Sequence, residues 1–222
     1  EAAQLYSGML VDVCRGIQDS GADLLVNYRP AEQLSVDVDP EQELRDLLDE
    51  MLEEPDEARY EVQVGTTYAG RVGNTVSHLL ADEGESTVSA VRATAPFLNR
   101  SIVGGAAMKL RSSDMVLGPT SDGRVYFAGF GGEIDFENAY DPPAVETLTE
   151  RAREAGLDVD FVEMTPVVET GRDLATALAQ LRARQRAERI VPAHTAAVVD
   201  EIGLTVADRD GGLAVARSSD RS

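Results

Sequence analysis

The chain has 222 residues, 43% of them apolar and 27% charged, and its 40 acidic and 20 basic residues give a formal charge of −20 at pH 7. This size and composition predict one soluble globular domain, or one domain with an appendage, around a substantial core. The charge repels phosphate backbones and anionic lipids, which argues against nucleic acid as a partner, and no stretch approaches the roughly 18 consecutive apolar residues of a membrane span.

The basic residues are almost all arginine, with Lys109 as the one lysine among the 20. A surface dense in carboxylates suits concentrated salt, because at molar ionic strength the Debye length falls to about 3 Å and the acidic groups repel one another only weakly. We therefore expect a cytoplasmic protein of archaeal, halophile-like type; an ordinary acidic protein from a GC-rich genome is the alternative. The single cysteine, Cys14, excludes an internal disulfide and a cysteine-based zinc cluster.

Apolar spacing predicts helices that alternate with short strands along the whole chain. Gly21 is a stop signal after the first helix, and Pro40 is placed to begin the second. We expect helices over residues 2–17, 40–52, 67–80, 99–110, 142–155, 172–186 and 192–202. We expect strands over residues 23–28, 60–64, 86–91, 115–117, 125–129, 159–162, 204–207 and 213–216. A Pro-Thr-Ser-Asp-Gly turn at 119–123 predicts a hairpin between the fourth and fifth strands.

This alternation predicts an α/β fold, with a mostly parallel sheet, helices on both faces and a terminal β-hairpin. We expect residues 1–190 to form the α/β domain and residues 191–222 to form an appendage of one helix and the hairpin. Ligands of such sheets bind beyond the carboxyl ends of the strands. The loops after Tyr28, Val64, Val91 and Leu117 are therefore the candidate binding loops.

Common catalytic signatures do not occur in the sequence: there is no glycine-rich phosphate loop with a lysine, no dinucleotide fingerprint, no serine elbow and no His-Glu-x-x-His. His78 and His194 stand on expected helices without a partner nearby, so neither is a candidate base. The strongest candidate segment is 117–129, which puts Asp122 and Arg124 on the turn between two strands. Asp122 could accept a sugar hydroxyl, a metal or a proton, but an Asp-Gly pair also makes an ordinary hairpin turn, and both interpretations stay open.

The string Leu-Gly-Pro-x-x-Asp-Gly-x-x-Tyr-x-x-Gly at 117–129 resembles a motif of a small family of bacterial and archaeal proteins. These are classed with the nucleotide-diphospho-sugar transferases of glycosyltransferase-A fold, a Rossmann-like architecture shared with sugar-phosphate nucleotidylyltransferases. The likeness extends from the Ala-Ala-x-Leu-Tyr opening through Gly65 and Arg71 to the Glu-Thr-x-x-Asp-Leu segment at 169–174. It implies a nucleotide-sugar bound across the strand ends together with Mg²⁺ or Mn²⁺.

The sequence departs from the family pattern at the expected metal site. Where the family has Gly-Ser-Asp-Ser-Pro, residues 92–96 read Arg-Ala-Thr-Ala-Pro, so Thr94 stands in place of the metal-binding aspartate. The family's Asp-Val-Asp-Thr becomes Val-Val-Glu-Thr at 167–170, which leaves Glu169 as the expected metal ligand, and the second glycine of the hairpin turn is Arg124. The family's first strand and its basic loop do not occur in these 222 residues, and we expect them upstream of Glu1.

The resemblance implies a site with one catalytic carboxylate, one metal ligand, two diphosphate-binding arginines and two residues on the nucleotide side: Asp122, Glu169, Arg71 with Arg124, and Thr94 with Gly123. Arg92 and Arg124 could supply positive charge in place of a cation. The local alternatives are a solvated surface arginine for Arg71, a turn hydroxyl for Thr94 and a helix cap for Glu169. Three functions stay open: sugar transfer from a nucleotide donor, a non-catalytic nucleotide-sugar-binding or regulatory protein that has lost its metal, and a nucleotidylyltransferase.

Overall fold

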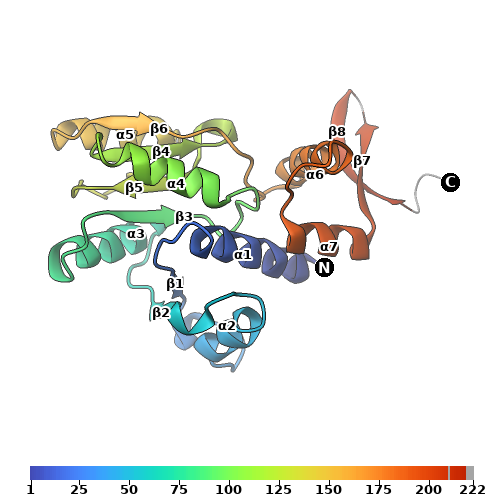
Figure 1. The fold of residues 1–222 in the computed structure, drawn as a ribbon, viewed down its shortest axis with the longest axis horizontal. Helices are drawn as coiled ribbons and strands as arrows, with labels where there is room; N and C mark the ends of the chain where they lie inside the picture. The colour runs from blue at the N-terminus through green and yellow to red at the C-terminus, as the bar shows by residue number, and fades with distance from the viewer. Residues whose placement is uncertain (210, 219–222) are drawn as a thin grey trace.

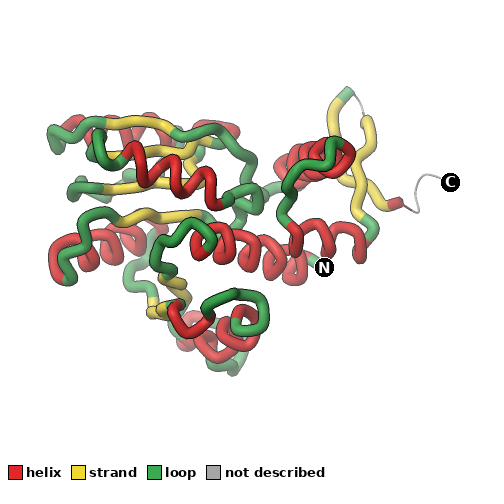
Figure 2. Tube along the Cα trace, viewed as in Figure 1, coloured by secondary structure: helices red, strands yellow, loops and turns green. Residues whose placement is uncertain are grey.

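The computed structural model of the chain describes residues 1–209 and 211–218, so residue 210 and residues 219–222 of the expected appendage lie outside the described residues. Figure 1 shows a central four-stranded sheet, a short two-stranded pair below it and a C-terminal hairpin to the right. The same three groups of strands are yellow in Figure 2, with red helices packed around them. No helix in the described ranges is long and apolar enough to cross a lipid bilayer.

The helices and strands follow the predicted order, and most boundaries differ by only a few residues. The α-helices are α1 (Ala2–Gln18), α2 (Pro40–Leu48), α3 (Tyr68–Ser77), α4 (Arg100–Lys109), α5 (Ala144–Glu154), α6 (Gly171–Arg186) and α7 (Ala193–Ile202). The strands are β1 (Leu25–Tyr28), β2 (Arg59–Val62), β3 (Val88–Val91), β4 (Met115–Pro119), β5 (Val125–Phe130), β6 (Val159–Phe161), β7 (Leu204–Arg209) and β8 (Gly212–Arg217).

Side-chain caps account for several of these helix starts. Asp39 accepts hydrogen bonds from the backbone N–H groups of the first turn of α2, Thr67 does the same for α3, and Asn99 does so for α4. Two α-helices end before their predicted last residues. The predicted helix 40–52 ends at Leu48. The α-helical part of the predicted helix 67–80 ends at Ser77, and a π-helical turn, η3 (His78–Asp82), follows it directly.

The central sheet has the order β3-β5-β4-β6, and it is mixed rather than mostly parallel as predicted. β5 runs antiparallel to both β3 and β4, whereas β4 and β6 are parallel. The reason is the short connection η4 (Ser121–Gly123) between β4 and β5, because a tight turn can join only antiparallel neighbours. The predicted hairpin at this point is therefore confirmed, and it inserts one antiparallel strand into the sheet.

Helices cover both faces of the central sheet, as predicted. On one face, Val76 of α3 and Leu148 of α5 pack with Met115 and Leu117 of β4. On the other face, Val13 of α1 and residues of α4 pack with Val116 of β4 and Tyr126 and Phe127 of β5. Every residue of β5 is buried. This explains why its sequence is a continuous apolar run rather than an alternating one.

The β1–β2 pair is parallel and forms its own core with α1 and α2, built on Leu24, Val26 and Leu48. At the other end of the molecule, α7 and the antiparallel β7–β8 hairpin pack into a core with α1 and α6. Asp12 links α1 to α7, since its carboxylate accepts hydrogen bonds from the backbone N–H of His194 and from the N–H and hydroxyl of Thr195. The hairpin itself was predicted; the division into residues 1–190 and 191–222 stays a prediction.

Candidate functional site

The candidate residues stand on loops that leave the carboxyl ends of β3, β4 and β6. Thr94 follows β3, Asp122 and Arg124 follow β4, and Glu169 follows β6. A backbone hydrogen bond from Val168 N to the Thr94 carbonyl, at 2.8 Å, ties the first of these loops to the last. The strand-end geometry expected of an open α/β sheet therefore brings two of the predicted loops, those after Val91 and Leu117, together with the segment after β6 that carries Glu169.

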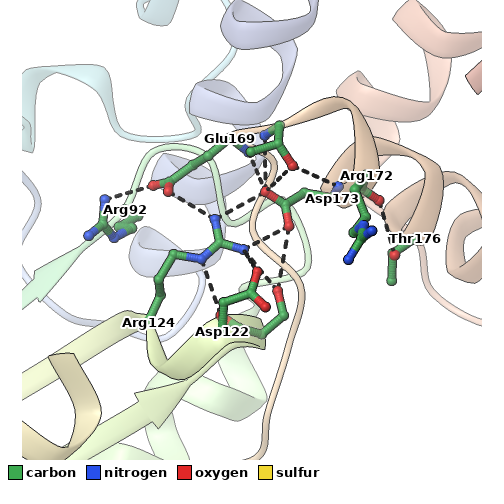
Figure 3. A network of polar contacts seen from close by, with 9 residues as sticks. Arg92, Asp122, Arg124, Glu169, Arg172, Asp173 and Thr176 are labelled. Atoms are coloured by element: carbon green, nitrogen blue, oxygen red, sulfur yellow. Dashed lines mark hydrogen bonds and ion pairs between the residues drawn. The ribbon is translucent and has the colours of Figure 1, made fainter. Parts of the chain in front are cut away.

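Arg124 is the centre of a polar network at this edge (Figure 3). Its Nε donates to the Ser121 carbonyl at 3.1 Å, and its Nη2 donates to Ser121 Oγ at 2.9 Å. The same guanidinium forms a fork on Asp173, with Nη1 on Oδ2 at 3.0 Å and Nη2 on Oδ1 at 2.7 Å. Its Nη1 also donates to Glu169 Oε2 at 3.0 Å. These five bonds equal the number of N–H donors of a guanidinium, so Arg124 has no donor left for a ligand.

Asp173 is the buried acceptor of that network, with only 5% of its side chain exposed. Thr170 and Asp173 form a capping box at the start of α6, in which each side chain accepts from the other residue's backbone N–H. Burial by itself would raise the pKa of Asp173, but hydrogen bonds from Arg124, Thr170 and the Glu169 N–H outweigh it and lower that pKa to about 2. Asp173 is thus a fixed carboxylate that anchors Arg124 to α6.

Glu169 lies between two arginines. Oε1 accepts from Arg92 Nη1 at 2.7 Å, and Oε2 accepts from Arg124 Nη1 at 3.0 Å. Arg92 is itself held by its Nε on the Val125 carbonyl at 2.9 Å and by stacking over the Tyr68 ring, 4.6 Å from the guanidinium carbon to the ring centre. Both carboxylate oxygens of the predicted metal ligand are therefore bound to guanidinium groups.

These side chains do not fit a divalent cation. Mg²⁺ and Mn²⁺ need several oxygen ligands whose negative charge is not already neutralised. The carboxylates of Glu169 and Asp173 are paired with Arg92 and Arg124. Among the described residues, no group of three or more His, Cys, Asp and Glu side chains is placed to hold a metal. Positive charge at this edge of the sheet comes from arginine.

Asp122 and Gly123 form the outer bend of the same loop. The Asp122 side chain is 76% exposed, and Oδ2 lies 3.6 Å from Arg124 Nη2, at the margin of the network. Both residues have positive φ, 59° at Asp122 and 68° at Gly123. A Cβ at Gly123 would lie 2.8 Å from Pro143 Cβ. Close packing against Pro143 thus requires this glycine, whatever else the bend does.

Arg71 lies apart from the Arg124 network, on the first turn of α3. It lines a large cavity of about 590 Å³ to which Tyr68 also contributes; Thr94, Asp122, Arg124 and Glu169 do not line it. The two groups meet at Tyr68, whose ring is under Arg92. Burial raises the pKa of Tyr68, while the charges of Arg92 and Arg71 act in the opposite direction. Tyr68 is therefore within electrostatic reach of both arginines.

The structure thus brings Thr94, Asp122, Gly123, Arg124 and Glu169 to one edge and places Arg71 beside it. Sequence reasoning missed two members of the site. Asp173 had a detectable signal, because Thr-x-x-Asp before an apolar run is a capping-box pattern. Tyr68 had none, since its contact with Arg92 joins two residues that only the fold brings together.

No protein-family model matches the chain, and no curated protein matches it. Among solved structures, the chain superposes on a protein of Desulfovibrio desulfuricans G20, provisionally described as a nucleotide-diphospho-sugar transferase. The TM-score is 0.71 at 21% identity, over 90% of this chain and 84% of that one. It also superposes on 4-diphosphocytidyl-2C-methyl-D-erythritol synthase from Anaerococcus prevotii DSM 20548, with a TM-score of 0.53 at 15% identity, over 78% of this chain and 89% of that one. The chain therefore has an α/β fold similar to that of a nucleotide-diphospho-sugar transferase.

Proposed function

We propose that this protein binds a nucleotide-sugar at the carboxyl ends of its strands, and that arginines rather than a divalent cation meet the diphosphate. The fold it shares with a nucleotide-diphospho-sugar transferase supports the ligand class. The observation that carries the proposal is the Glu169 carboxylate, which accepts from both Arg92 and Arg124. A guanidinium occupies the side of that carboxylate where a cation would otherwise be held.

Arg92 and Arg71 are the proposed diphosphate ligands. Arg92 uses Nε and Nη1 within the protein, and no hydrogen bond from its Nη2 is found in the described part of the chain. Among the residues that the structure describes, the Arg71 side chain makes a single long hydrogen bond, 3.4 Å from Nη1 to the Thr66 carbonyl, and its buried Nε has no partner there. Both arginines lie by the first turn of α3, where the helix dipole favours an anion. Arg124, with every donor engaged, is a positioning residue that holds Glu169 and hence Arg92.

The remaining predicted residues take proposed roles around that diphosphate. Asp122 is exposed at the outer bend and can accept hydrogen bonds from sugar hydroxyl groups. Thr94 and Gly123 would line the nucleotide side of the same edge. In this arrangement the acidic member that contacts the ligand is Asp122, and Glu169 and Asp173 orient arginines.

Calorimetric titration with uridine, guanosine, cytidine and adenosine diphosphosugars in molar KCl tests the proposal. We expect binding of at least one of them in EDTA, with an affinity that added Mg²⁺ or Mn²⁺ changes by less than about twofold. Arg71→Gln and Arg92→Gln should each weaken it about tenfold or more, the equivalent of about 1.4 kcal/mol. Arg186→Gln, at the far end of α6, is the matched control. Binding that requires the metal, or no binding to any member of the panel, would refute the proposal.

Sugar transfer and nucleotidyl transfer are separate questions for the same site. The superposition on 4-diphosphocytidyl-2C-methyl-D-erythritol synthase makes nucleotidyl transfer the second candidate. It is distinguished by pyrophosphate release from a nucleoside triphosphate. Turnover of a bound nucleotide-sugar in the presence of acceptors would instead favour the glycosyltransferase, and metal-independent binding without turnover favours a binding or regulatory protein.

We also propose that the protein works in concentrated salt in the cytoplasm. The formal charge of −20 supports this, because self-repulsion of that size is screened at molar ionic strength. Thermal unfolding at 0.1 M and 3 M KCl tests it: the midpoint should rise with salt. A midpoint that is independent of KCl would contradict the proposal.

A further inference from the structure

Two tyrosines lie against each other beside the proposed diphosphate site. Tyr68 begins helix α3, and Tyr140 belongs to the segment between β5 and α5. Their ring centres are 4.9 Å apart and their planes meet at 86°, an edge-to-face arrangement that aromatic pairs prefer. The guanidinium carbon of Arg92 lies 4.6 Å from the centre of the Tyr68 ring. A second ring and a cation therefore hold the Tyr68 ring before any ligand binds.

The hydroxyl groups of the two tyrosines have different surroundings. The Tyr140 hydroxyl is buried without a hydrogen-bond partner among the described residues, and burial raises the pKa of Tyr140 well above its ordinary value. The Tyr68 side chain is half-buried, and its hydroxyl does not belong to the buried unpaired polar atoms. Within residues 1–209 and 211–218, no hydrogen bond of that hydroxyl is found. The Tyr68 O–H is thus a donor that reaches the surface and is unpaired in this part of the chain.

Tyr68 lies between the two arginines that are proposed to bind the diphosphate. It stands three residues before Arg71, so the two side chains are neighbours on the first turn of α3, and both line the cavity of about 590 Å³. Burial raises the pKa of Tyr68, whereas the charges of Arg92 and Arg71 lower it, so both guanidinium groups act on the hydroxyl. An anion that contacts both arginines would come within reach of this phenol.

Given the proposed function, on which this inference rests, we propose that Tyr68 is a third ligand-binding residue, whose hydroxyl donates to a diphosphate oxygen between Arg92 and Arg71. A hydrogen bond to a charged acceptor is stronger than one between neutral groups. The phenol supplies such a bond without adding a charge. Because Tyr140 and Arg92 already hold the ring, little side-chain freedom is lost when the ligand binds.

Two matched variants test this role by calorimetric titration with the nucleotide-sugar that the parent protein binds most tightly. Tyr68→Phe removes the hydroxyl and keeps the ring next to Arg92. Tyr140→Phe removes a neighbouring hydroxyl that is buried. We expect Tyr68→Phe to weaken binding about tenfold and Tyr140→Phe to change it by less than about twofold. The thermal midpoint of Tyr68→Phe should stay within about 2 °C of the parent, because its hydroxyl has no partner in the described part of the chain.

Tyr68→Leu tests the ring separately from the hydroxyl. Leucine removes the aromatic face that Arg92 contacts, so Arg92 loses one of its supports. We expect Tyr68→Leu to bind about threefold more weakly than Tyr68→Phe, in line with the modest strength of a cation–π contact. Tighter binding by Tyr68→Leu than by Tyr68→Phe would contradict the supporting role of the ring.

A probe without sugar or base separates the role of Tyr68 from the proposed function. Inorganic pyrophosphate should shift the ring resonances of Tyr68 in NMR spectra of tyrosine-labelled protein, and Tyr68→Phe should weaken its binding too. If Arg71→Gln and Arg92→Gln weaken binding but Tyr68→Phe does not, the role of Tyr68 is overturned and the proposed function stands. Equal losses for Tyr68→Phe and Tyr140→Phe also overturn that role, because they would reflect packing. If neither pyrophosphate nor any nucleotide-sugar binds, both proposals fail.

Discussion

The Arg124 network and the cavity of about 590 Å³ beside it lie in the same α/β fold, and they differ in how their polar groups are paired. In the network, a half-buried guanidinium donates to five acceptor atoms within the chain, on Ser121, Glu169 and Asp173. Residues of β1 and β3 line the cavity, and in the described part of the chain each of these strands has a strand partner on one edge only. A buried polar group is stable only when it is paired. The network is therefore paired within the chain, whereas β1 and β3 each keep one open edge.

The difference bears on function because the two regions meet at Tyr68 and its neighbours. Arg92 belongs to the network, and Arg71 lines the cavity. The proposed diphosphate site thus takes one arginine from the network and one from the cavity wall. Substitutions within the network should cost much unfolding free energy, and substitutions at the open edge of β3 should cost little.

The largest expected effect is the loss of Arg124. Arg124→Met leaves Asp173 as a buried carboxylate without its main partner, and removing one member of a buried ion pair costs about 3–5 kcal/mol. Urea unfolding in molar KCl measures the change. The control is Arg111→Met, an exposed residue whose side chain, within the described ranges, hydrogen-bonds to the Met108 sulfur alone; it should stay within about 0.5 kcal/mol of the parent. If Arg124→Met lowered the unfolding free energy by less than about 1 kcal/mol, the network would not be a main source of stability at this edge of the sheet.

Lowering the pH should weaken the same network, because it protonates the Asp173 carboxylate. The pKa of Asp173 is lowered to about 2 from an ordinary 3.8, so its stabilisation is fully present above about pH 4 and is lost as the pH falls through 2. The amount is roughly 2 kcal/mol of unfolding free energy. Many carboxylates titrate in this window, so the measurement is the difference in pH dependence between the parent and Asp173→Asn. Parallel stability curves for the two proteins between pH 5 and pH 2 would contradict the assignment.

A smaller effect is expected at the outer bend. Gly123→Ala places a Cβ 2.8 Å from Pro143 Cβ at a φ of 68°, and the left-handed conformation alone costs an alanine about 1–2 kcal/mol. Gly104→Ala is the matched control, because a Cβ there meets nothing within 4 Å in helix α4. It should stabilise the protein by about 0.5–1 kcal/mol. Equal effects of the two substitutions, measured by urea unfolding, would show that the bend is not constrained.

The smallest effect belongs to the open edge. Ser89→Pro should change the unfolding free energy by less than about 1 kcal/mol, because the Ser89 N–H points away from β5, no other strand in the described ranges pairs with β3, and proline is tolerated at sheet edges. Ala90→Pro is the matched variant on the paired side, opposite Ala128 of β5, and should cost clearly more. Similar losses for Ser89→Pro and Ala90→Pro would indicate that both edges of β3 are already paired.

The elements themselves could be predicted from local patterns. The helices α1, α4 and α6 begin and end within a residue or two of their expected bounds, because apolar spacing and the caps at Asn99 and Thr170 are local signals. The order and direction of the strands in the central sheet are not determined by local sequence patterns. The antiparallel direction of β5 follows from its turn, but a mostly parallel sheet was expected because the other strands alternate with helices.

The candidate site was predictable in its position and not in its chemistry. Strand-end logic and the motif at 117–129 led to Asp122 and Arg124, and the family pattern at 167–170 led to Glu169; the fold gathers all three at one edge. The expectation that Arg124 would face a diphosphate came from the family resemblance and from its charge. Its acceptors on Glu169 and Asp173 lie 45 and 49 residues away in the chain, and no local pattern reports such pairings.

The sequence by itself determined the order of helices and strands, the apolar faces that bury them and the loops at which a ligand site would lie, since these depend on periodicity and on neighbours within a turn or two. The tertiary structure decided which charges cancel and which backbone edges stay open. Both depend on distances between segments far apart in the chain. Pairing with two carboxylates makes the Arg124 guanidinium part of the scaffold, and the strand order leaves one edge of β3 without a strand partner in the described part of the chain.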